Sequence, residues 1–167
     1  RSGERAATLD AVATAAKVSK GGLLYHFSSK KVLLEALAER TLTLAEEDFA
    51  AMEQAPEGAS AYYINSSTPD NSPFDRALIA LSRLAQSNNE LAQQTMARVQ
   101  DGWHALVLAE IGDEQITRAV LLLGDGMYYN AAFGGGATNP QTADMLKSDR
   151  AALERALKVL KAAVAAD

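Results

Sequence analysis

Residues 8–31 read TLDAVATAAKVSKGGLLYHFSSKK, and this stretch decides the fold of the N-terminal part of the chain. Thr8 has the side chain of a helix N-cap, and apolar residues follow it at the spacing of one helical face. Ser19 is expected to cap a second short helix that runs to about Phe27. The stretch therefore predicts a helix, a tight turn and a second helix.

Positive charge is concentrated in the same stretch. Between Asp10 and Glu35 the sequence has no acidic residue. The lysines in that interval are Lys17, Lys20, Lys30 and Lys31. A basic cluster of this kind is also typical of an ordinary solvated surface. Lys30 and Lys31, however, fall in the first turn of the next expected helix, where cations oppose the helix dipole by about 0.3–1 kcal/mol each. A nearby phosphate would reverse the sign of that interaction, which favours a nucleic-acid partner.

The second short helix is expected to begin with a pair of glycines. Residues 19–22 read SKGG and place Gly21 and Gly22 in its first turn, at a cost of about 1 kcal/mol each relative to alanine. Free amides without bulky side chains suit the close approach of a phosphate backbone and of base edges in the major groove. Tyr25 and His26 follow on the same helix, within reach of sugar and phosphate oxygens.

A long ordered pattern runs through residues 8–33, and its members are Thr8, Val12, Ala13, Ala16, Val18, Ser19, Gly21, Tyr25, His26, Phe27, Lys30 and Leu33. The pattern resembles the DNA-binding segment of the TetR family of bacterial transcriptional regulators, which reads close to T-x-x-x-I-A-x-x-A-G-V-S-x-G-x-x-Y-x-H-F-x-x-K-x-x-L. Tyr25 lies one place from the commonest aromatic position of that family, and Lys17 stands where the family usually has glycine. The resemblance implies a helix-turn-helix that reads operator DNA.

The DNA-contacting residues predicted from this motif are Thr8, Lys17, Ser19, Lys20, Gly21, Gly22, Tyr25, His26 and Lys30. Phe27 is expected to be part of the core instead. In the family a further helix precedes the position of Thr8 and packs on the helix-turn-helix. We expect the chain as given to lack that first helix, in which case Val12, Phe27 and Leu33 would lose their cover.

The overall composition excludes several other classes of protein. The chain has 167 residues, of which 48% are hydrophobic and 22% charged, as is typical of a globular protein. It has no cysteine, so it can form no disulfide and no thiolate metal site. Its apolar runs are far shorter than the roughly 20 residues of a membrane span, and no signal peptide is recognisable. We therefore expect a cytoplasmic protein with no membrane partner.

Charge divides the chain into two parts. Residues 1–40 carry seven basic and four acidic side chains, a net charge of +3, whereas residues 41–167 carry nine and seventeen, a net charge of −8. Such an asymmetry indicates parts with different partners. We predict a helix-turn-helix DNA-binding domain in residues 1–34 and a helical ligand-binding and dimerisation domain in residues 35–167.

Helical periodicity continues through the second part, and an all-α protein is predicted because few segments alternate as a strand would. A helix about 37 Å long is expected from Ser29 to near Pro56, where it could connect the two domains. A short helix over residues 59–64 and a loop over residues 65–73 follow. Four more helices are expected, including one over residues 113–133 that ends at the glycines of residues 134–136.

The last two helices are predicted to pair with a second copy of the chain. Residues 113–133 carry apolar side chains on two faces, whereas a helix exposed on one side needs only one such face. The final helix has leucines at spacings of four and three, which is typical of a packing seam. We expect a four-helix bundle between two chains. Its predicted residues are Leu121, Leu122, Leu153, Leu157, Leu160 and Val164.

A small-molecule pocket is the other prediction for the helical domain. Its candidate residues are Tyr62, Met96, Trp103, His104, Tyr128 and Tyr129. The same residue types at helical spacing are also typical of an ordinary core, and both interpretations stay open. Asp125 and Asn130 lie in a mainly apolar helix, where each needs a hydrogen-bond partner. No metal site and no cofactor are expected, because His104 has no second histidine or cysteine near it.

The sequence is compatible with three classes of function to different degrees. The leading prediction is a one-component transcriptional repressor that binds palindromic double-stranded operator DNA as a homodimer and is released by a small-molecule effector. The alternative is a helical dimeric sensor or interaction module that does not bind DNA. An enzyme is not expected, because the sequence has two distant histidines, no cysteine and no G-x-S-x-G motif.

Overall fold

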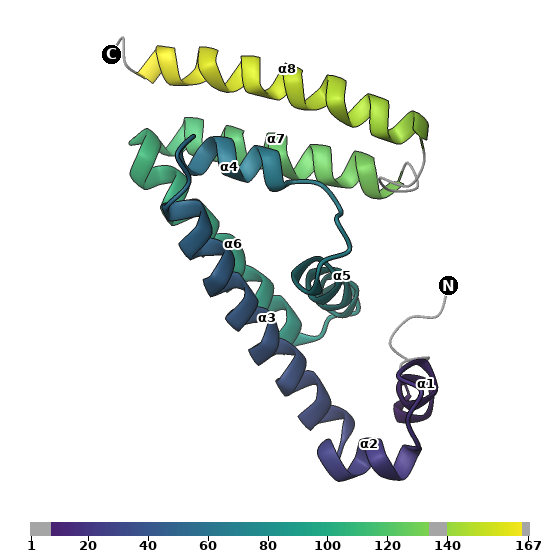
Figure 1. The fold of residues 1–167 in the computed structure, drawn as a ribbon. Coiled ribbons are helices and arrows are strands. Elements are labelled where there is room, and N and C mark those ends of the chain that lie inside the picture. Colours follow the sequence, from purple (N-terminus) through teal and green to yellow (C-terminus); the bar gives the residue numbers. More distant parts are fainter. Residues whose placement is uncertain (1–7, 134–139, 165–167) are drawn as a thin grey trace.

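The computed structural model describes residues 8–133 and 140–164, and within these ranges every regular element is a helix. The elements are α1 (Leu9–Ala15), α2 (Lys20–His26), α3 (Lys30–Glu53), α4 (Ala59–Ser66), α5 (Pro73–Gln86), α6 (Glu90–Ile111), α7 (Glu114–Phe133) and α8 (Pro140–Val164) (Figure 1). The all-α prediction is confirmed. The expected absence of the family's first helix concerns residues 1–7, which lie outside the described residues, as do the glycines of residues 134–136.

The first three helices begin where the sequence predicts them. The side chains of Thr8, Ser19 and Ser29 are the N-caps of α1, α2 and α3. Each side-chain oxygen accepts a hydrogen bond from the amide three residues on, at 3.0–3.2 Å. An N-cap of this type contributes about 1 kcal/mol to helix stability, so these short elements are fixed largely by local interactions.

The long helix α3 connects the N-terminal helices to the rest of the molecule (Figure 1). It packs against α5 and α6, while α4 lies against α6, α7 and α8. The close approach of α3 and α6 depends on Gly102, because a side chain there would overlap the ring of Phe49. The predicted domain boundary between residues 34 and 35 falls within α3, so this helix runs through both parts.

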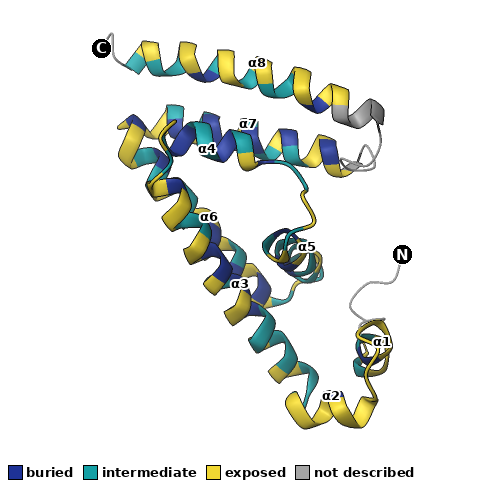
Figure 2. Ribbon diagram, in the orientation of Figure 1, coloured by how far each residue is buried: buried dark blue, intermediate teal, exposed yellow. Residues whose placement is uncertain are grey.

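The hydrophobic core lies between α3, α4, α6, α7 and α8 (Figure 2). Its buried residues are Met52, Ala59, Tyr63, Ile64, Val107, Ile111, Val120, Leu121, Met127, Ala131, Leu146 and Leu157. By contrast, the described part of the N-terminal segment ahead of α3 has two buried residues, Ala13 and Leu23. Val12, Phe27 and Leu33 are half-buried.

One element boundary differs from the prediction. The loop expected over residues 65–73 is shorter, because α4 continues to Ser66 and α5 begins at Pro73. Asn65 is held at the end of α4, since its carbonyl oxygen accepts a hydrogen bond from Arg150 of α8 at 3.1 Å. Local helix propensity gives no information about a contact between residues so far apart in sequence.

Among the described residues, no helix combines the length and the apolar character that a membrane span needs.

Candidate nucleic-acid interface and effector site

The turn between α1 and α2 is closed by backbone hydrogen bonds. The amide of Val18 donates to the carbonyl of Ala13 at 3.0 Å, and the amide of Lys17 donates to that of Thr14 at 3.1 Å. These two bonds form a Schellman motif, which requires a left-handed residue after the helix. Lys17 is that residue, with φ of 56°. The glycine expected at this position in related sequences would adopt the same backbone without a side-chain penalty.

The recognition segment presents most of its predicted residues to solvent. Of the nine predicted DNA contacts, eight are exposed and Lys30 is half-buried. Tyr25 is 86% exposed, and its ring meets that of His26 edge-on at 5.2 Å between centroids. An aromatic side chain this exposed gains little from the protein's own core, so its position favours contact with another molecule.

The glycines of α2 leave open space at the start of the helix. A side chain built on Gly21 would meet no other atom within 4 Å, so nothing inside the described chain demands a glycine there. At Gly22 the nearest such atom is the Ser19 hydroxyl, at 3.2 Å. Because Gly21 costs helix stability without relieving an internal clash, its benefit is expected outside the molecule.

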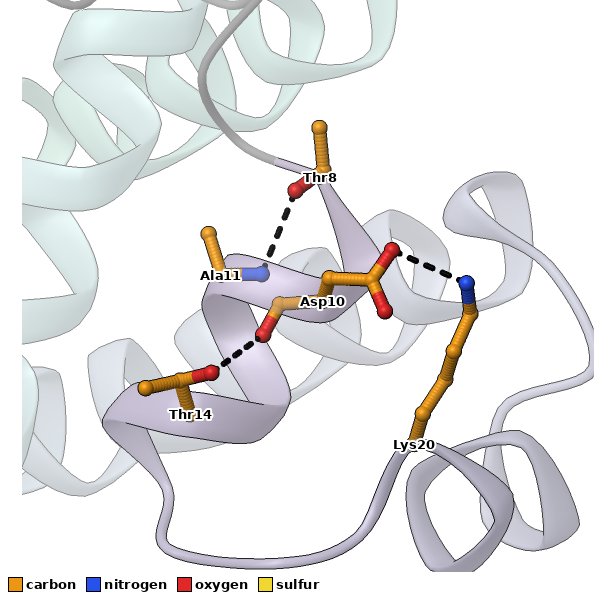
Figure 3. Close-up of polar contacts among 5 residues, drawn as sticks. All are labelled: Thr8, Asp10, Ala11, Thr14 and Lys20. Carbon is orange, nitrogen blue, oxygen red and sulfur yellow. Dashed lines mark hydrogen bonds and ion pairs between the residues drawn. The ribbon is translucent and has the colours of Figure 1, made fainter.

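Lys20 and Lys31 each lie in an ion pair. Lys20 of α2 contacts Asp10 of α1 at 2.9 Å between Nζ and Oδ2 (Figure 3). Lys31 lies 3.7 Å from Glu35, one turn further along α3. Residues 8–34 contain four lysines and one acidic residue, Asp10, so the segment keeps a net charge of +3.

Residues 1–37 match the family model described as bacterial regulatory proteins, tetR family. Residues 1–37 therefore carry the N-terminal module of the TetR family. The described part of the match is the helix-turn-helix and the first part of α3, so the chain is a TetR-type transcription regulator with a DNA-binding helix-turn-helix. No curated protein and no solved structure matches the chain.

In the helical body of this TetR-type regulator, aromatic side chains donate to aspartates between helices. Asp48 of α3 accepts from the Tyr62 hydroxyl at 3.0 Å and from Trp103 Nε1 at 2.8 Å. One carboxylate therefore joins α3 to both α4 and α6. Hydrogen bonds to a charged acceptor are worth about 1.5–3 kcal/mol each, so this junction is a strong one.

Two further tyrosine–aspartate pairs join α4 and α5 to α7. The Tyr63 hydroxyl donates to Asp125 of α7 at 2.8 Å, and the Tyr63 ring lies edge-on to Trp103 at 5.5 Å between centroids. The Phe74 ring is 6.1 Å from the same indole. Beside it in sequence, buried Asp75 accepts from the Tyr128 hydroxyl. We name Asp48, Tyr62, Tyr63, Phe74, Asp75, Trp103, Asp125 and Tyr128 the aromatic–aspartate cluster.

Burial and the aspartates hold the three tyrosines of this cluster in the protonated form. Burial, followed by the charge of Asp48, raises the pKa of Tyr62 to about 12. Burial and Asp125 raise the pKa of Tyr63, while burial and the hydrogen bond to Asp75 raise that of Tyr128. Each phenol is thus a donor at neutral pH, and each aspartate is its acceptor.

The structure brings half of the predicted pocket residues into this cluster. Tyr62, Trp103 and Tyr128 belong to it, while Met96 is half-buried two turns before Trp103 on α6. His104 points elsewhere, because its Nε2 lies 2.8 Å from Glu114 Oε1. Tyr129 is 55% exposed.

The sequence reading missed four members of the cluster, Asp48, Tyr63, Phe74 and Asp75. Asp48 follows Glu46 and Glu47, and an acidic run is normally solvated, so nothing in the sequence distinguishes it. Asp125 did give a signal, since it interrupts an apolar helix, and Tyr63 is its partner. Asn130, flagged for the same reason, is exposed.

The predicted dimer residues divide between the core and the outer surface. Leu121 and Leu157 are buried within their own chain, and Leu153, Leu160 and Val164 pack against that core. Leu122 is 54% exposed. It lies in a shallow groove of about 650 Å³ between the outer faces of α7 and α8, whose lining residues are Ala119, Leu122, Leu123, Ala152, Arg155, Ala156, Val159 and Leu160.

Proposed function

We propose that this TetR-type regulator is a repressor that binds palindromic operator DNA as a homodimer and is released by a small-molecule effector. The observation that carries the proposal is the exposed, glycine-opened start of α2 within a positively charged helix-turn-helix. A phosphate backbone supplies the charge that this surface lacks, and the glycines allow its close approach.

The DNA contacts we propose are the nine predicted ones, Thr8, Lys17, Ser19, Lys20, Gly21, Gly22, Tyr25, His26 and Lys30. In a two-fold symmetric dimer, the recognition helices would lie about 34–36 Å apart, or a longer multiple of one DNA turn. Operator half-sites should then be inverted repeats with centres spaced by whole turns.

Salt-dependent binding is the direct test of this interface. Wild type is titrated against DNA duplexes that it selects from a random pool, over a range of salt concentrations. Lys30→Gln should flatten the slope of log affinity against log salt by about one unit, because one phosphate contact is lost. Lys158→Gln on exposed α8 makes the same change of net charge as a control. Failure of wild type to select or bind any duplex would favour a sensor module without DNA binding.

We propose that dimerisation uses the outer face of α7 and α8. Leu122 and Val159 are 54% and 65% exposed there, and a second copy would bury both. Two helices from each chain would form a four-helix bundle. Leu122→Glu should yield monomers by sedimentation velocity at micromolar concentration, whereas Leu24→Glu in the N-terminal segment should leave the dimer intact. A wild type that sediments as a monomer contradicts the proposal.

The effector site we propose is the region of the aromatic–aspartate cluster. Asp48 lies on α3, the helix whose first residue follows the helix-turn-helix, so a ligand that competes for Asp48 would bear directly on α3. By linkage, a ligand that weakens DNA binding must itself bind more weakly to the DNA-bound form.

Trp103 offers a direct readout of that site, because it is the single tryptophan of the chain. Native mass spectrometry of protein purified from its host would identify a bound small molecule. Titration with that molecule should change the Trp103 fluorescence and lower the affinity for the selected duplex. Tyr62→Phe should weaken effector binding, whereas Tyr25→Phe on α2, outside the helical body, is the control and should leave effector binding unchanged. A molecule that binds without affecting DNA affinity would contradict the effector role.

A further inference from the structure

The ion pair between Lys20 and Asp10 joins the two helices of the helix-turn-helix (Figure 3). Lys20 is the first residue of α2, directly after its Ser19 cap and directly before the paired glycines. Its Nζ lies 2.9 Å from Asp10 Oδ2. The lysine that flanks the open start of the recognition helix is therefore already bound to an anion of the same chain.

Local structure fixes the position of Asp10. The residue lies in the first turn of α1, where its negative charge favours the helix dipole. Thr8 caps the helix by accepting from the amide of Ala11 at 3.2 Å, and the Thr14 hydroxyl donates to the Asp10 carbonyl at 2.9 Å (Figure 3). The carboxylate thus projects from a backbone that is held on both sides, while Lys20 reaches it along a flexible side chain.

Asp10 is also the only acidic residue between positions 8 and 34. Its pairing neutralises one of the four lysines in a segment where every other charge suits a polyanion. Both side chains remain accessible, with 55% of Lys20 and 64% of Asp10 exposed. An exposed pair of this kind is weak and is readily exchanged for a better partner.

We propose that Asp10 is a specificity-determining residue that withholds Lys20 from DNA of arbitrary sequence. The inference rests on the DNA binding proposed above. Binding to arbitrary DNA is driven almost entirely by cations that neutralise phosphates, so an internally neutralised lysine weakens it. At an operator, base contacts made by α2 hold the helix against the groove, and Lys20 exchanges Asp10 for the DNA. The carboxylate therefore lowers affinity for arbitrary sequence more than affinity for the operator.

Asp10→Asn tests the proposal, because the amide keeps the shape of the side chain and removes its charge. The first probe is a labelled duplex of mixed sequence, titrated by fluorescence anisotropy at several salt concentrations. Freeing one lysine should steepen the log–log salt slope by about 0.9, which amounts to roughly fivefold to tenfold tighter binding at 0.1 M salt. The second probe is a duplex that wild type selects from a random pool, for which the variant should gain less than about twofold.

A double-mutant cycle shows whether the effect acts through Lys20. In the Lys20→Gln background, Asp10→Asn should leave affinity for the mixed duplex unchanged, because Asp10 then has no paired lysine to release. Glu154→Gln on exposed α8 makes the same change of net charge and should not alter binding. Unchanged urea midpoints for all variants establish that folding is intact.

Four results separate the possible failures. An Asp10→Asn variant with the wild-type salt slope overturns the inference, and so does an equal gain in the Lys20→Gln background, which would show a general effect of charge. An equal gain on both duplexes leaves Asp10 without a role in specificity and also overturns it. A wild type that binds neither duplex refutes the proposed DNA binding itself.

Discussion

The helix-turn-helix and the helical body are stabilised in different ways. Helices α1 and α2 are seven residues each, are capped by Thr8 and Ser19, and bury Ala13 and Leu23. The body has helices of up to 25 residues around a core of fully buried side chains (Figure 2). Local hydrogen bonds therefore shape the part that faces DNA, whereas burial of apolar surface stabilises the part that positions it.

The largest expected difference between the two regions comes from shortening one leucine-sized side chain in each. Ile64 of α4 is completely buried, so Ile64→Ala should lower the free energy of unfolding by about 2–5 kcal/mol. Leu24 of α2 is 36% exposed, and Leu24→Ala should cost less than about 1 kcal/mol. Urea unfolding followed by circular dichroism measures both. Equal losses would show that the two regions share one kind of stability.

The next largest effect is expected in the aromatic–aspartate cluster. Asp48→Ala removes the acceptor of both Tyr62 and Trp103, and leaving these donors without a partner should cost about 2–3 kcal/mol. Asp48→Asn keeps one acceptor oxygen and should recover part of the loss. If Asp48→Ala unfolds at the wild-type urea concentration, the carboxylate does not join α3 to α4 and α6.

Sequence reading was more successful for the short capped helices than for this cluster. The caps Thr8, Ser19 and Ser29 are local signals, and the structure confirms each of them. Asp48 gave no signal, because its partners Tyr62 and Trp103 are 14 and 55 positions away. Only packing brings these residues together.

The two faces predicted for residues 113–133 show a related limit. The apolar pattern indicates two faces, but it does not say which one packs inside the chain. Leu121 is buried in the core of its own chain, whereas its neighbour Leu122 is exposed. The choice depends on where α4 and α8 lie relative to α7, and helical periodicity contains no information about that.

Alkaline pH should weaken the body through the cluster tyrosines. The pKa of Tyr62 is raised to about 12 in the folded protein, while an unfolded tyrosine titrates near 10. Above about pH 10 the unfolded chain loses this proton more readily, so the free energy of unfolding is unaffected below pH 10 and falls as pH rises toward 12. Urea unfolding between pH 9 and 11 measures the fall. Tyr62→Phe should make it shallower, and an identical pH profile for that variant would contradict the assignment to Tyr62.

The smallest expected effect concerns the turn of the helix-turn-helix, where backbone conformation and charge are opposed. Lys17 has φ of 56°, a region in which glycine avoids the steric cost that a side chain incurs. Lys17→Gly should therefore stabilise the folded protein by up to about 1 kcal/mol, while removing a predicted phosphate contact and flattening the salt slope of DNA binding by about one unit. Lys17→Asn separates the two causes, since asparagine tolerates this backbone and has no charge. It should reproduce the loss of DNA affinity with a smaller gain in stability. If both variants bind DNA as wild type does, the charge at position 17 makes no phosphate contact, and the left-handed turn is the only consequence of this residue.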